Sequence, residues 1–425
     1  MKIFVHRTLF AGLFGLALAG CGGGGGGSVN DSPPGTVFPT AVVPALPLPG
    51  PSAVACSNVV QDFTRLAPGE DVKDYWEGAP TASGRARYAT DLLADPANTL
   101  SVTVRAPNDG NLYGSFAGKD IVSVIIVCYP TTAGNARSDY LLPTGLVVPH
   151  MQTGAQLPLF ADPATRYPVL AFSHGYGGSP LSDDYVAALS WFASYGYIVV
   201  APFHGDPRIS DVKIDNFNDA VMVLSHLGDF TALQTMRPLA MSAALDLVLA
   251  HPQWRDHVNA AQIGGFGASM GGETLMLMGG AGFTVTAGLS STRITLDPRL
   301  KAVAAYIPYF GEPFLPAFGR DQRGLDGVTL PYLAISGTAD TTAPIALAQQ
   351  GIARLAGPRG LVSLAGVKHR FDAASTNDIF TWSITFLDAE ARGDPVARQR
   401  LSTMASVAGG NDDRVVIPYN GAAPN

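Results

Sequence analysis

The chain has 425 residues, of which 47% are hydrophobic and only 14% are charged. This composition is sufficient for a large buried core, in one large domain or in one domain with a small companion. The formal net charge of −7 argues against a nucleic acid as partner.

The first twenty residues have the pattern of an export signal. The positively charged Lys2 and Arg7 precede an apolar run at 9–19. This run is too short to span a bilayer as a mature helix. The run ends in Leu-Ala-Gly-Cys, which resembles the bacterial lipobox. We therefore predict a lipoprotein signal peptide over residues 1–20 and a lipid on Cys21, with an ordinary cleaved secretory signal as the alternative. Because Gly22 rather than Asp follows the cysteine, the outer membrane is the expected location.

Residues 21–55 are predicted to form an extended tether. They begin with the glycine tract 22–27 and continue poor in charge and rich in Pro, Ser, Val and Ala. The two cysteines that remain after Cys21 are Cys56 and Cys128, and in an exported protein such a pair is a candidate disulfide. Two free thiols are the alternative.

Two kinds of pattern follow the tether. Residues 56–160 are β-rich, with apolar, β-branched runs at 100–104 and 121–128, and are predicted to join a sheet. From 161 to 405 strand patterns alternate with helix patterns, which predicts a catalytic domain built on a mostly parallel sheet with helices on both faces. Residues 406–425 are expected to be a C-terminal tail.

One connection in the alternating region is unusually long. More than thirty residues separate the strand expected at 197–203 from the next helix, whereas most connections in such folds have two to six. Its apolar residues would not remain in water, so a candidate lid is placed over 207–236. Met222 and Phe230 in it, with Tyr309 on the opposite wall, are candidates for a substrate pocket. The alternative is that this connection packs on the core and lines no pocket.

The segment 264–272, which reads G-G-F-G-A-S-M-G-G, contains the spacing Gly-x-Ser-x-Gly between a predicted strand and a predicted helix. This spacing is typical of a sharp turn that presents a serine nucleophile, here Ser269. The glycines two positions before and after remove Cβ atoms that would clash. The helix that follows directs its N–H groups to the place where an oxyanion would form. Taken alone, the motif also fits a plain glycine-rich turn; the spacing of a phosphate-binding loop is not met.

The partners that such a serine needs follow in chain order. Asp340 ends a predicted buried strand, and His369 follows a short strand and a turn. A serine hydroxyl needs a base to take its proton, and the imidazole needs a carboxylate to set its tautomer. Nucleophile, acid and base in this order are expected for a parallel α/β sheet of this kind. The sequence therefore predicts Ser269, Asp340 and His369 to be a catalytic triad.

A second glycine-rich loop, His174-Gly-Tyr-Gly-Gly, stands at the end of the strand predicted at 169–173. In acyl-transfer enzymes of this architecture that loop supplies one donor of the oxyanion hole. The predicted donors are the backbone N–H groups of Tyr176 and of Met270, the residue after the serine. His174 itself is interpreted as a structural anchor of the loop.

From about Tyr167 to Gly393 these motifs resemble the α/β-hydrolase superfamily. The resembling branch holds platelet-activating-factor acetylhydrolase-like and predicted dienelactone-hydrolase-like proteins; bacterial cutinases and polyester hydrolases are similar more weakly. Two differences are visible: true dienelactone hydrolases have a cysteine where this chain has Ser269, and compact cutinases lack a stretch like 207–236. The resemblance implies an α/β-hydrolase fold with an N-terminal β-rich segment.

These observations together predict an exported, lipid-anchored serine hydrolase that cleaves carboxylic esters through an acyl-enzyme. The expected partners are a small-molecule or lipid ester and the membrane, and no metal or other cofactor is expected. A serine peptidase and a polyester or cutinase-like hydrolase remain open, as does a non-catalytic surface lipoprotein on a hydrolase scaffold. The natural ester, its acyl length and the oligomeric state are left open.

Overall fold

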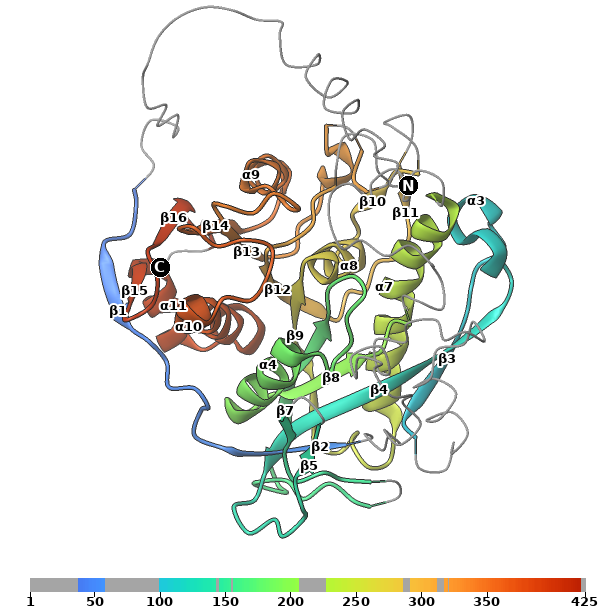
Figure 1. The fold of residues 1–425 in the computed structure, drawn as a ribbon, viewed down its shortest axis with the longest axis vertical. Coiled ribbons are helices and arrows are strands. Elements are labelled where there is room, and N and C mark those ends of the chain that lie inside the picture. The colour runs from blue at the N-terminus through green and yellow to red at the C-terminus, as the bar shows by residue number, and fades with distance from the viewer. Residues whose placement is uncertain are drawn as a thin grey trace, which may run out of the picture. The chain divides into compact units, whose positions relative to one another are not determined.

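The computed structural model describes residues 37–57, 99–142, 145–153, 156–205, 227–285, 291–311, 317–319 and 321–421. Ten strands of these residues form one sheet (Figure 1). Its order is β16 (Asp413–Ile417), β14 (Arg359–Leu364), β13 (Tyr332–Gly337), β12 (Leu300–Tyr306), β9 (Val258–Ala268), β7 (Tyr167–Ser173), β8 (Ile198–Pro202), β4 (Asp120–Thr131) and β2 (Ala53–Ser57), with β3 (Ser101–Arg105) paired to β4.

The middle of the sheet, from β14 to β8, is parallel, and the strands at its two ends are antiparallel. All seven residues of β7 are buried: Val169 and Ala171 belong to the core on one face, Leu170 and Phe172 to the core on the other. A near-continuous apolar run is what a parallel strand covered on both faces requires. The predicted mostly parallel sheet with helices on both faces is thereby confirmed.

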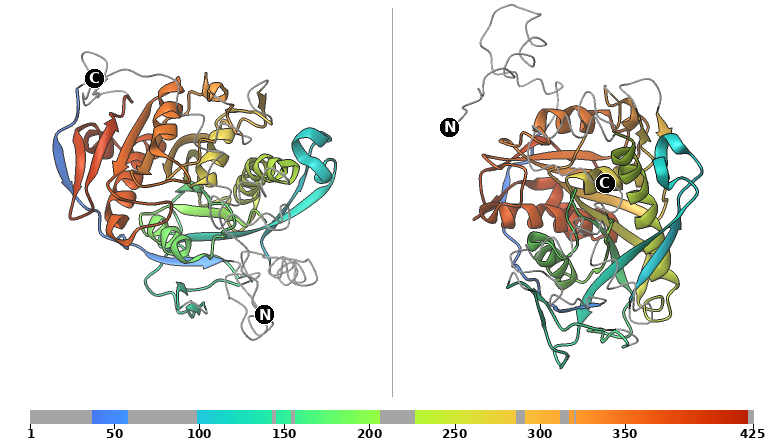
Figure 2. Two further views of the ribbon diagram at one scale, coloured as in Figure 1. Left: turned by 45° about the horizontal axis from the view of Figure 1, so that its top comes forward. Right: turned by 45° about the vertical axis from the view of Figure 1, so that its right-hand side comes forward.

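Helices lie on both faces of the sheet (Figure 1 and Figure 2), and their buried side chains belong to two separate cores. One face is covered by α7 (Leu227–Ala250), α8 (Met270–Met278) and α9 (Ile345–Arg354). The other is covered by α4 (Asp183–Ser194), α10 (Thr376–Leu387) and α11 (Pro395–Thr403), with a π-helical turn at Asp388–Arg392 between the last two. Within the described ranges, no helix combines the length and the hydropathy needed to cross a bilayer.

The described end of the expected tether is part of the fold. β1 (Ala41–Pro44) pairs in parallel with β15 (Met404–Ala408), and the inner side chain of Val43 is buried. Beyond it, Leu46 N–H donates to Thr381 Oγ1 at 3.0 Å, and Gly50 N–H donates to Ser194 Oγ at 2.6 Å. The prediction of an extended tether through residue 55 is therefore wrong for 41–55. A low content of charged residues is typical of a linker, but here the backbone groups find hydrogen-bond partners in α4, α10 and β15.

The N-terminal β-rich region joins the main sheet without a boundary near residue 160. Cys56 of β2 stands opposite Cys128 of β4, and the two form a disulfide. The shorter elements among the described residues are α3 (Gly110–Tyr113), the 3₁₀ turns Gly114–Phe116, Arg323–Leu325 and Ala373–Ser375, and the strand pairs β5 (Tyr140–Leu141) with β6 (Val147–Val148) and β10 (Gly282–Phe283) with β11 (Thr292–Arg293).

Two further boundaries differ from the expectation. The candidate lid 207–236 overlaps the start of α7, where residues 230–236 are buried in the helix; 207–226 lie outside the described residues. The expected tail 406–425 contains the end of β15 and all of β16, which pairs with β14. Asp413 at the start of β16 accepts from Trp382 Nε1 at 2.6 Å. This segment forms an edge strand because its partners in β14 and α10 are distant in the sequence and close in the fold.

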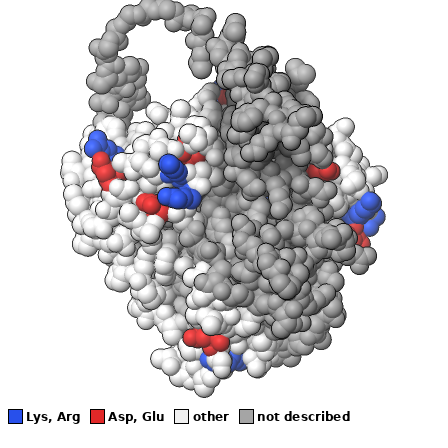
Figure 3. All heavy atoms as spheres, in the orientation of Figure 1, with Lys and Arg blue, Asp and Glu red and all other residues white. Residues whose placement is uncertain are grey.

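Among the described residues on the face drawn in Figure 3, uncharged side chains outnumber charged ones. There the Lys and Arg side chains of the described residues lie beside Asp and Glu rather than in one continuous basic area. Examples of such exposed pairs are Arg105 with Asp120 and Arg414 with Asp412. Exposed pairs of this kind contribute about 0–1 kcal/mol each, so the fold is held by its two apolar cores.

Candidate active site

Ser269 lies at the turn between β9 and α8, and its backbone has φ 54° and ψ −121°. A non-glycine residue rarely adopts a positive φ, and such strain is maintained only where the surroundings impose it. Here Ser269 N–H donates to Tyr306 O, and Ser269 O accepts from Tyr309 N–H, both at 3.0 Å. A Cβ on Gly271 would collide with the carbonyl oxygen of Ser173, which explains the glycine two residues after the serine.

The three predicted triad residues come together at the carboxyl ends of β9, β13 and β14. Ser269 Oγ lies 2.8 Å from His369 Nε2, and His369 Nδ1 lies 2.7 Å from Asp340 Oδ2. The other carboxylate oxygen, Asp340 Oδ1, accepts from the N–H groups of Thr342 and Ala343 at 2.9 and 2.8 Å. A carboxylate held in this way keeps the proton of the imidazole on Nδ1 and leaves Nε2 to accept from the serine.

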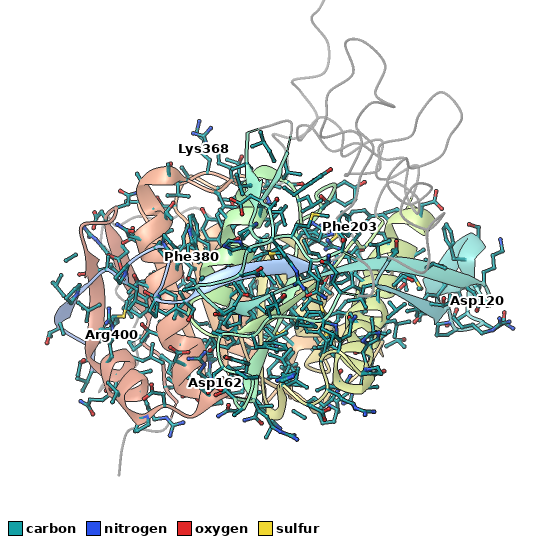
Figure 4. The ribbon with its side chains drawn as sticks, turned by 90° about the horizontal axis from the view of Figure 1, so that it is seen from below. Asp120, Asp162, Phe203, Lys368, Phe380 and Arg400 are labelled. Atoms are coloured by element: carbon teal, nitrogen blue, oxygen red, sulfur yellow. A yellow bond between two sulfur atoms is a disulfide. The ribbon has the colours of Figure 1, made fainter. Side chains whose placement is uncertain are left out.

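The loop that carries His369 is held in place by contacts with Tyr306. Tyr306 Oη donates to Arg370 O at 2.7 Å, and Phe371 packs on Tyr306 with ring centroids 4.8 Å apart. In Figure 4 the side chain of Lys368, the neighbour of His369, points outward from the ribbon, while Phe380 of α10 lies among the packed layers. The imidazole side chain is 22% exposed and that of Asp340 is 0% exposed. The imidazole is therefore partly accessible, whereas the carboxylate that holds it is buried.

The predicted oxyanion loop lies against the serine. A Cβ placed on Gly175 would come within 3.5 Å of Ser269 Cβ. The N–H of Gly175 donates to Tyr185 Oη at 2.9 Å, which ties the loop to α4. On the other side, Met270 is the first residue of α8, so its N–H belongs to the N-terminal turn, where the helix dipole favours negative charge. The two predicted donors thus belong to segments that adjoin Ser269.

His174 lies beneath the loop as a buried, neutral side chain. Its Nδ1 is 2.8 Å from Gly175 O, and its Nε2 accepts from His204 N–H at 3.3 Å. Burial, and then the nearby Arg237 guanidinium, hold the pKa of His174 well below its usual value. Burial, Arg237 and His174 lower the pKa of His204 in the same way. A neutral His174 with its proton on Nδ1 can donate to Gly175 O, in keeping with a structural anchor.

Glu273, one turn after the serine on α8, is a second buried ionisable group. It is 1% exposed; Oε1 accepts from Gln234 Nε2 at 2.7 Å, and Oε2 has no hydrogen-bond partner among the described residues. Burial raises the pKa of this carboxyl to about 8, although Arg237 and the bond from Gln234 act in the opposite direction. At neutral pH the side chain is therefore mostly protonated.

The pocket candidates differ in how far the structure supports them. The ring of Phe230 on α7 lies 5.9 Å from that of Tyr176, and the backbone of Tyr309 bonds to Ser269. Both side chains are buried, with exposures of 2% and 9%. Met222 lies outside the described residues. Phe230 thus packs on the residue predicted to be an oxyanion donor, and Tyr309 is bonded through its backbone to the serine, so both stay candidates for a pocket wall.

Sequence reasoning missed three polar side chains that shape this site. Arg237, Tyr185 and Glu273 are far apart in the chain and occur in no motif. The available signal was the isolation of Arg237 and Glu273 within apolar helices, since a buried charge needs a partner. In the part of the chain that the structure describes, no group of three or more His, Cys, Asp or Glu side chains is placed to hold a metal ion.

Residues 141–221 match the family model described as platelet-activating factor acetylhydrolase, isoform II. This segment contains β7, the oxyanion loop, α4 and β8, and it ends before Ser269. No curated protein matches the chain. The likeness to dienelactone hydrolases, cutinases and polyester hydrolases therefore remains a prediction. With its mostly parallel sheet covered by helices, and with 141–221 similar to the platelet-activating factor acetylhydrolase family, the chain has the fold of the α/β-hydrolase superfamily.

Proposed function

We propose that this protein is a serine hydrolase that cleaves carboxylic esters through a covalent acyl-enzyme. The observation that carries the proposal is the continuous chain of hydrogen bonds from Ser269 Oγ through His369 to Asp340, at 2.8 and 2.7 Å. Its position supports the same reading, because the serine stands on a strained turn at the start of a helix. The family match supports ester hydrolysis as the reaction class.

The geometry allows each step to be assigned to an atom. Ser269 Oγ attacks the ester carbonyl carbon while His369 Nε2 takes the hydroxyl proton, and Asp340 stabilises the imidazolium. The carbonyl oxygen becomes an oxyanion that the N–H groups of Tyr176 and Met270 bind. The C–O bond then breaks, and His369 gives its proton to the departing alcohol. Water, activated by His369, hydrolyses the acyl-enzyme by the same steps and releases the acid.

The proposed substrate class rests on the family match and on the N-terminal sequence. The matched family is named for an acetylhydrolase that acts on platelet-activating factor. We therefore propose an ester with a short acyl chain, on a lipid or a small molecule, as the substrate. Export and lipid attachment at Cys21 would bring the enzyme to a membrane; this residue lies outside the described residues.

The test combines turnover with active-site labelling. Wild-type protein should hydrolyse p-nitrophenyl acetate and react with a fluorophosphonate at Ser269. Ser269→Ala should abolish labelling and lower kcat by roughly 10⁶-fold, because a triad acts as a unit. Asp340→Asn should lower kcat on the order of 10⁴-fold, because the amide favours the wrong imidazole tautomer. A phospholipid with a short acyl chain, tested beside p-nitrophenyl esters of two to twelve carbons, defines the substrate class.

Two outcomes would contradict the proposal. Labelling that persists in Ser269→Ala, at another serine, would mean that the nucleophile is wrongly assigned. A folded wild-type protein that hydrolyses none of these esters and takes up no fluorophosphonate would favour a non-catalytic lipoprotein on the same scaffold.

A further inference from the structure

Arg237 is a fully buried arginine directly beneath the oxyanion loop. It lies in the middle of α7, it is 1% exposed, and it is among the largest fully buried side chains of the described residues. Its Nη2 donates to the carbonyl oxygens of His174 and Gly175 at 2.5 and 3.1 Å. Its Nη1 lies 3.4 Å from Thr274 Oγ1 on α8. One side chain thus connects α7, the oxyanion loop and the helix that begins after Ser269.

These contacts fix two consecutive peptide units. In the first, the carbonyl of His174 is held by Arg237, and the N–H of Gly175 is held from the opposite side by Tyr185 Oη at 2.9 Å. In the second, the carbonyl of Gly175 accepts from Arg237, from His174 Nδ1 at 2.8 Å and from Gly178 N–H at 3.4 Å. The second unit also carries the N–H of Tyr176, the proposed oxyanion donor.

A planar trans peptide points its C=O and its N–H in opposite directions. Whatever holds the carbonyl of Gly175 therefore also determines where the N–H of Tyr176 points. Glycine at 175 has no Cβ to restrict its backbone, so this orientation has to be imposed from outside the loop. Arg237 and His174 bond to the carbonyl of Gly175 from the buried side, so the N–H of the same peptide unit points away from these two side chains.

We propose that Arg237 is a positioning residue for the hydrolytic reaction: it holds the Gly175 carbonyl so that the Tyr176 N–H is preorganised for the oxyanion. This inference rests on the proposed function of the site. Arginine suits the task because its planar fork binds several acceptors in one fixed geometry, which a lysine ammonium cannot do. Its positive charge is on the far side of the loop from the oxyanion and has the sign that favours the transition state.

A positioning role for Arg237 predicts a change in kcat that a role in folding stability alone would not produce. Arg237→Lys keeps the charge and loses the fork, and Arg237→Gln keeps a planar donor and loses the charge. Both should lower kcat for p-nitrophenyl acetate by roughly 10- to 100-fold with KM within about threefold, because oxyanion donors act on the transition state. Arg299→Lys is the control: Arg299 is a partly buried arginine whose guanidinium bonds to the carboxylate of Asp297 instead of to the loop, so its variant should keep kcat within about threefold.

A spectroscopic readout separates positioning from stability. An acyl-enzyme formed from an isotope-labelled, slowly hydrolysed aromatic acyl imidazole reports on the oxyanion hole, because hydrogen bonds from its donors lower the carbonyl stretching frequency. In Arg237→Lys and Arg237→Gln that infrared band should move to higher frequency or split, whereas in Arg299→Lys it should stay at the wild-type position. Thermal melts identify which variants are folded at the assay temperature, and the two substitutions at 237 give two chances of a folded one.

The outcomes are decisive in each direction. A folded variant at 237 that keeps wild-type kcat and an unshifted carbonyl band would overturn the role of Arg237 and leave the proposed hydrolase intact. A loss of kcat without a band shift would overturn it as well, since the oxyanion hole would then be unchanged. A wild-type protein that forms no acyl-enzyme would overturn both proposals.

Discussion

At the scale of single residues, burial decides the charge states around the serine. His174, His204 and Glu273 are each at most 2% exposed, and the ordinary pKa of each is shifted toward the neutral form. Burial makes charge costly, so the pKa shifts of all three groups favour their neutral forms in the neighbourhood of the Arg237 guanidinium.

Because Glu273 is buried, we expect the free energy of unfolding to depend on pH. Its pKa is raised from 4.5 to about 8 in the folded state, so between these values the folded protein binds a proton that the unfolded chain has lost. The free energy of unfolding from this group therefore falls as pH rises from 4.5 to 8, by at most about 1.4 kcal/mol per pH unit. Glu273→Gln keeps an acceptor for Gln234 and cannot ionise. Its melting temperature should exceed that of wild type at pH 9 and approach it at pH 4.5, as measured by thermal melts across this range. Equal melting temperatures at pH 9 would show that the carboxyl is not buried as described.

We expect a substitution of Phe230 to change the acyl length of the ester that the protein prefers. Its ring contacts Tyr176 beside the serine, so a smaller side chain would leave space there. Phe230→Leu should move the preferred p-nitrophenyl ester to a longer acyl chain while acetate turnover stays within about tenfold, because one pocket contact contributes roughly 1–3 kcal/mol. Phe192→Leu is the control, since Phe192 is equally buried but belongs to the core on the other face of the sheet. An unchanged chain-length profile in folded Phe230→Leu would remove Phe230 from the pocket.

At the scale of elements, the segment that carries β1 and β2 connects the helices on one face of the sheet to the edge of the sheet at β4. It pairs with β15, bonds to α10 and α4, and then pairs with β4 at the edge of the sheet. The disulfide between Cys56 and Cys128 joins that edge covalently and closes a loop with a sequence separation of 72 residues. In the chain-entropy model such a loop closure contributes about 4 kcal/mol.

A pair of truncations tests this role. A protein that starts at residue 37 keeps β1 and β2 and should melt at the wild-type temperature. A protein that starts at residue 56 loses β1 and three of the five residues of β2, including buried Val54 and Ala55. It should melt at a clearly lower temperature or fail to accumulate as folded protein, because buried backbone groups of β15 and β4 lose their partners. Equal melting temperatures for the two would show that β1 and β2 contribute little.

At the scale of the whole molecule, strands from both ends of the described chain complete one sheet. β2 at one edge and β16 at the other flank the parallel strands that carry the triad, so the N-terminal β-rich region and the C-terminal strands belong to one folding unit. Such non-local pairing is costly to form during folding, and the disulfide between Cys56 and Cys128 holds one of these pairings together at the edge of the sheet.

The sequence at residues 1–21 predicts attachment of the whole protein to a membrane. Cys21→Ser removes the thiol that would carry the lipid, so the protein should move from the membrane fraction to the soluble fraction or accumulate with its signal uncleaved. The measurement is fractionation of cells with an immunoblot, accompanied by labelling with a radioactive fatty acid. Hydrolytic activity of released protein should equal that of wild type. Membrane association and labelling that survive the substitution would mean that the lipobox interpretation is wrong.

The sequence by itself determined the local features of this protein. The nucleophile turn could be predicted because its constraint lies within a few residues: glycines at 267 and 271 are needed by the backbone next to them. The buried strands could be predicted because a parallel strand covered on both faces must be apolar along its length. Asp340 and His369 could be proposed because strand ends on one edge of such a sheet converge.

Only the tertiary structure decided what depends on distant partners. Residues 41–55 and 406–417 read as linker and tail, yet they form strands because Ala41 meets Met404 and Leu364 meets Asp413 across the fold. Arg237 is 62 residues from the carbonyl of Gly175 that it holds, and no local pattern links them. Burial and turns leave patterns in neighbouring residues, so they can be predicted from the sequence. The partner of a buried charge or of an edge strand is distant in the chain, so it is known only from the packed structure.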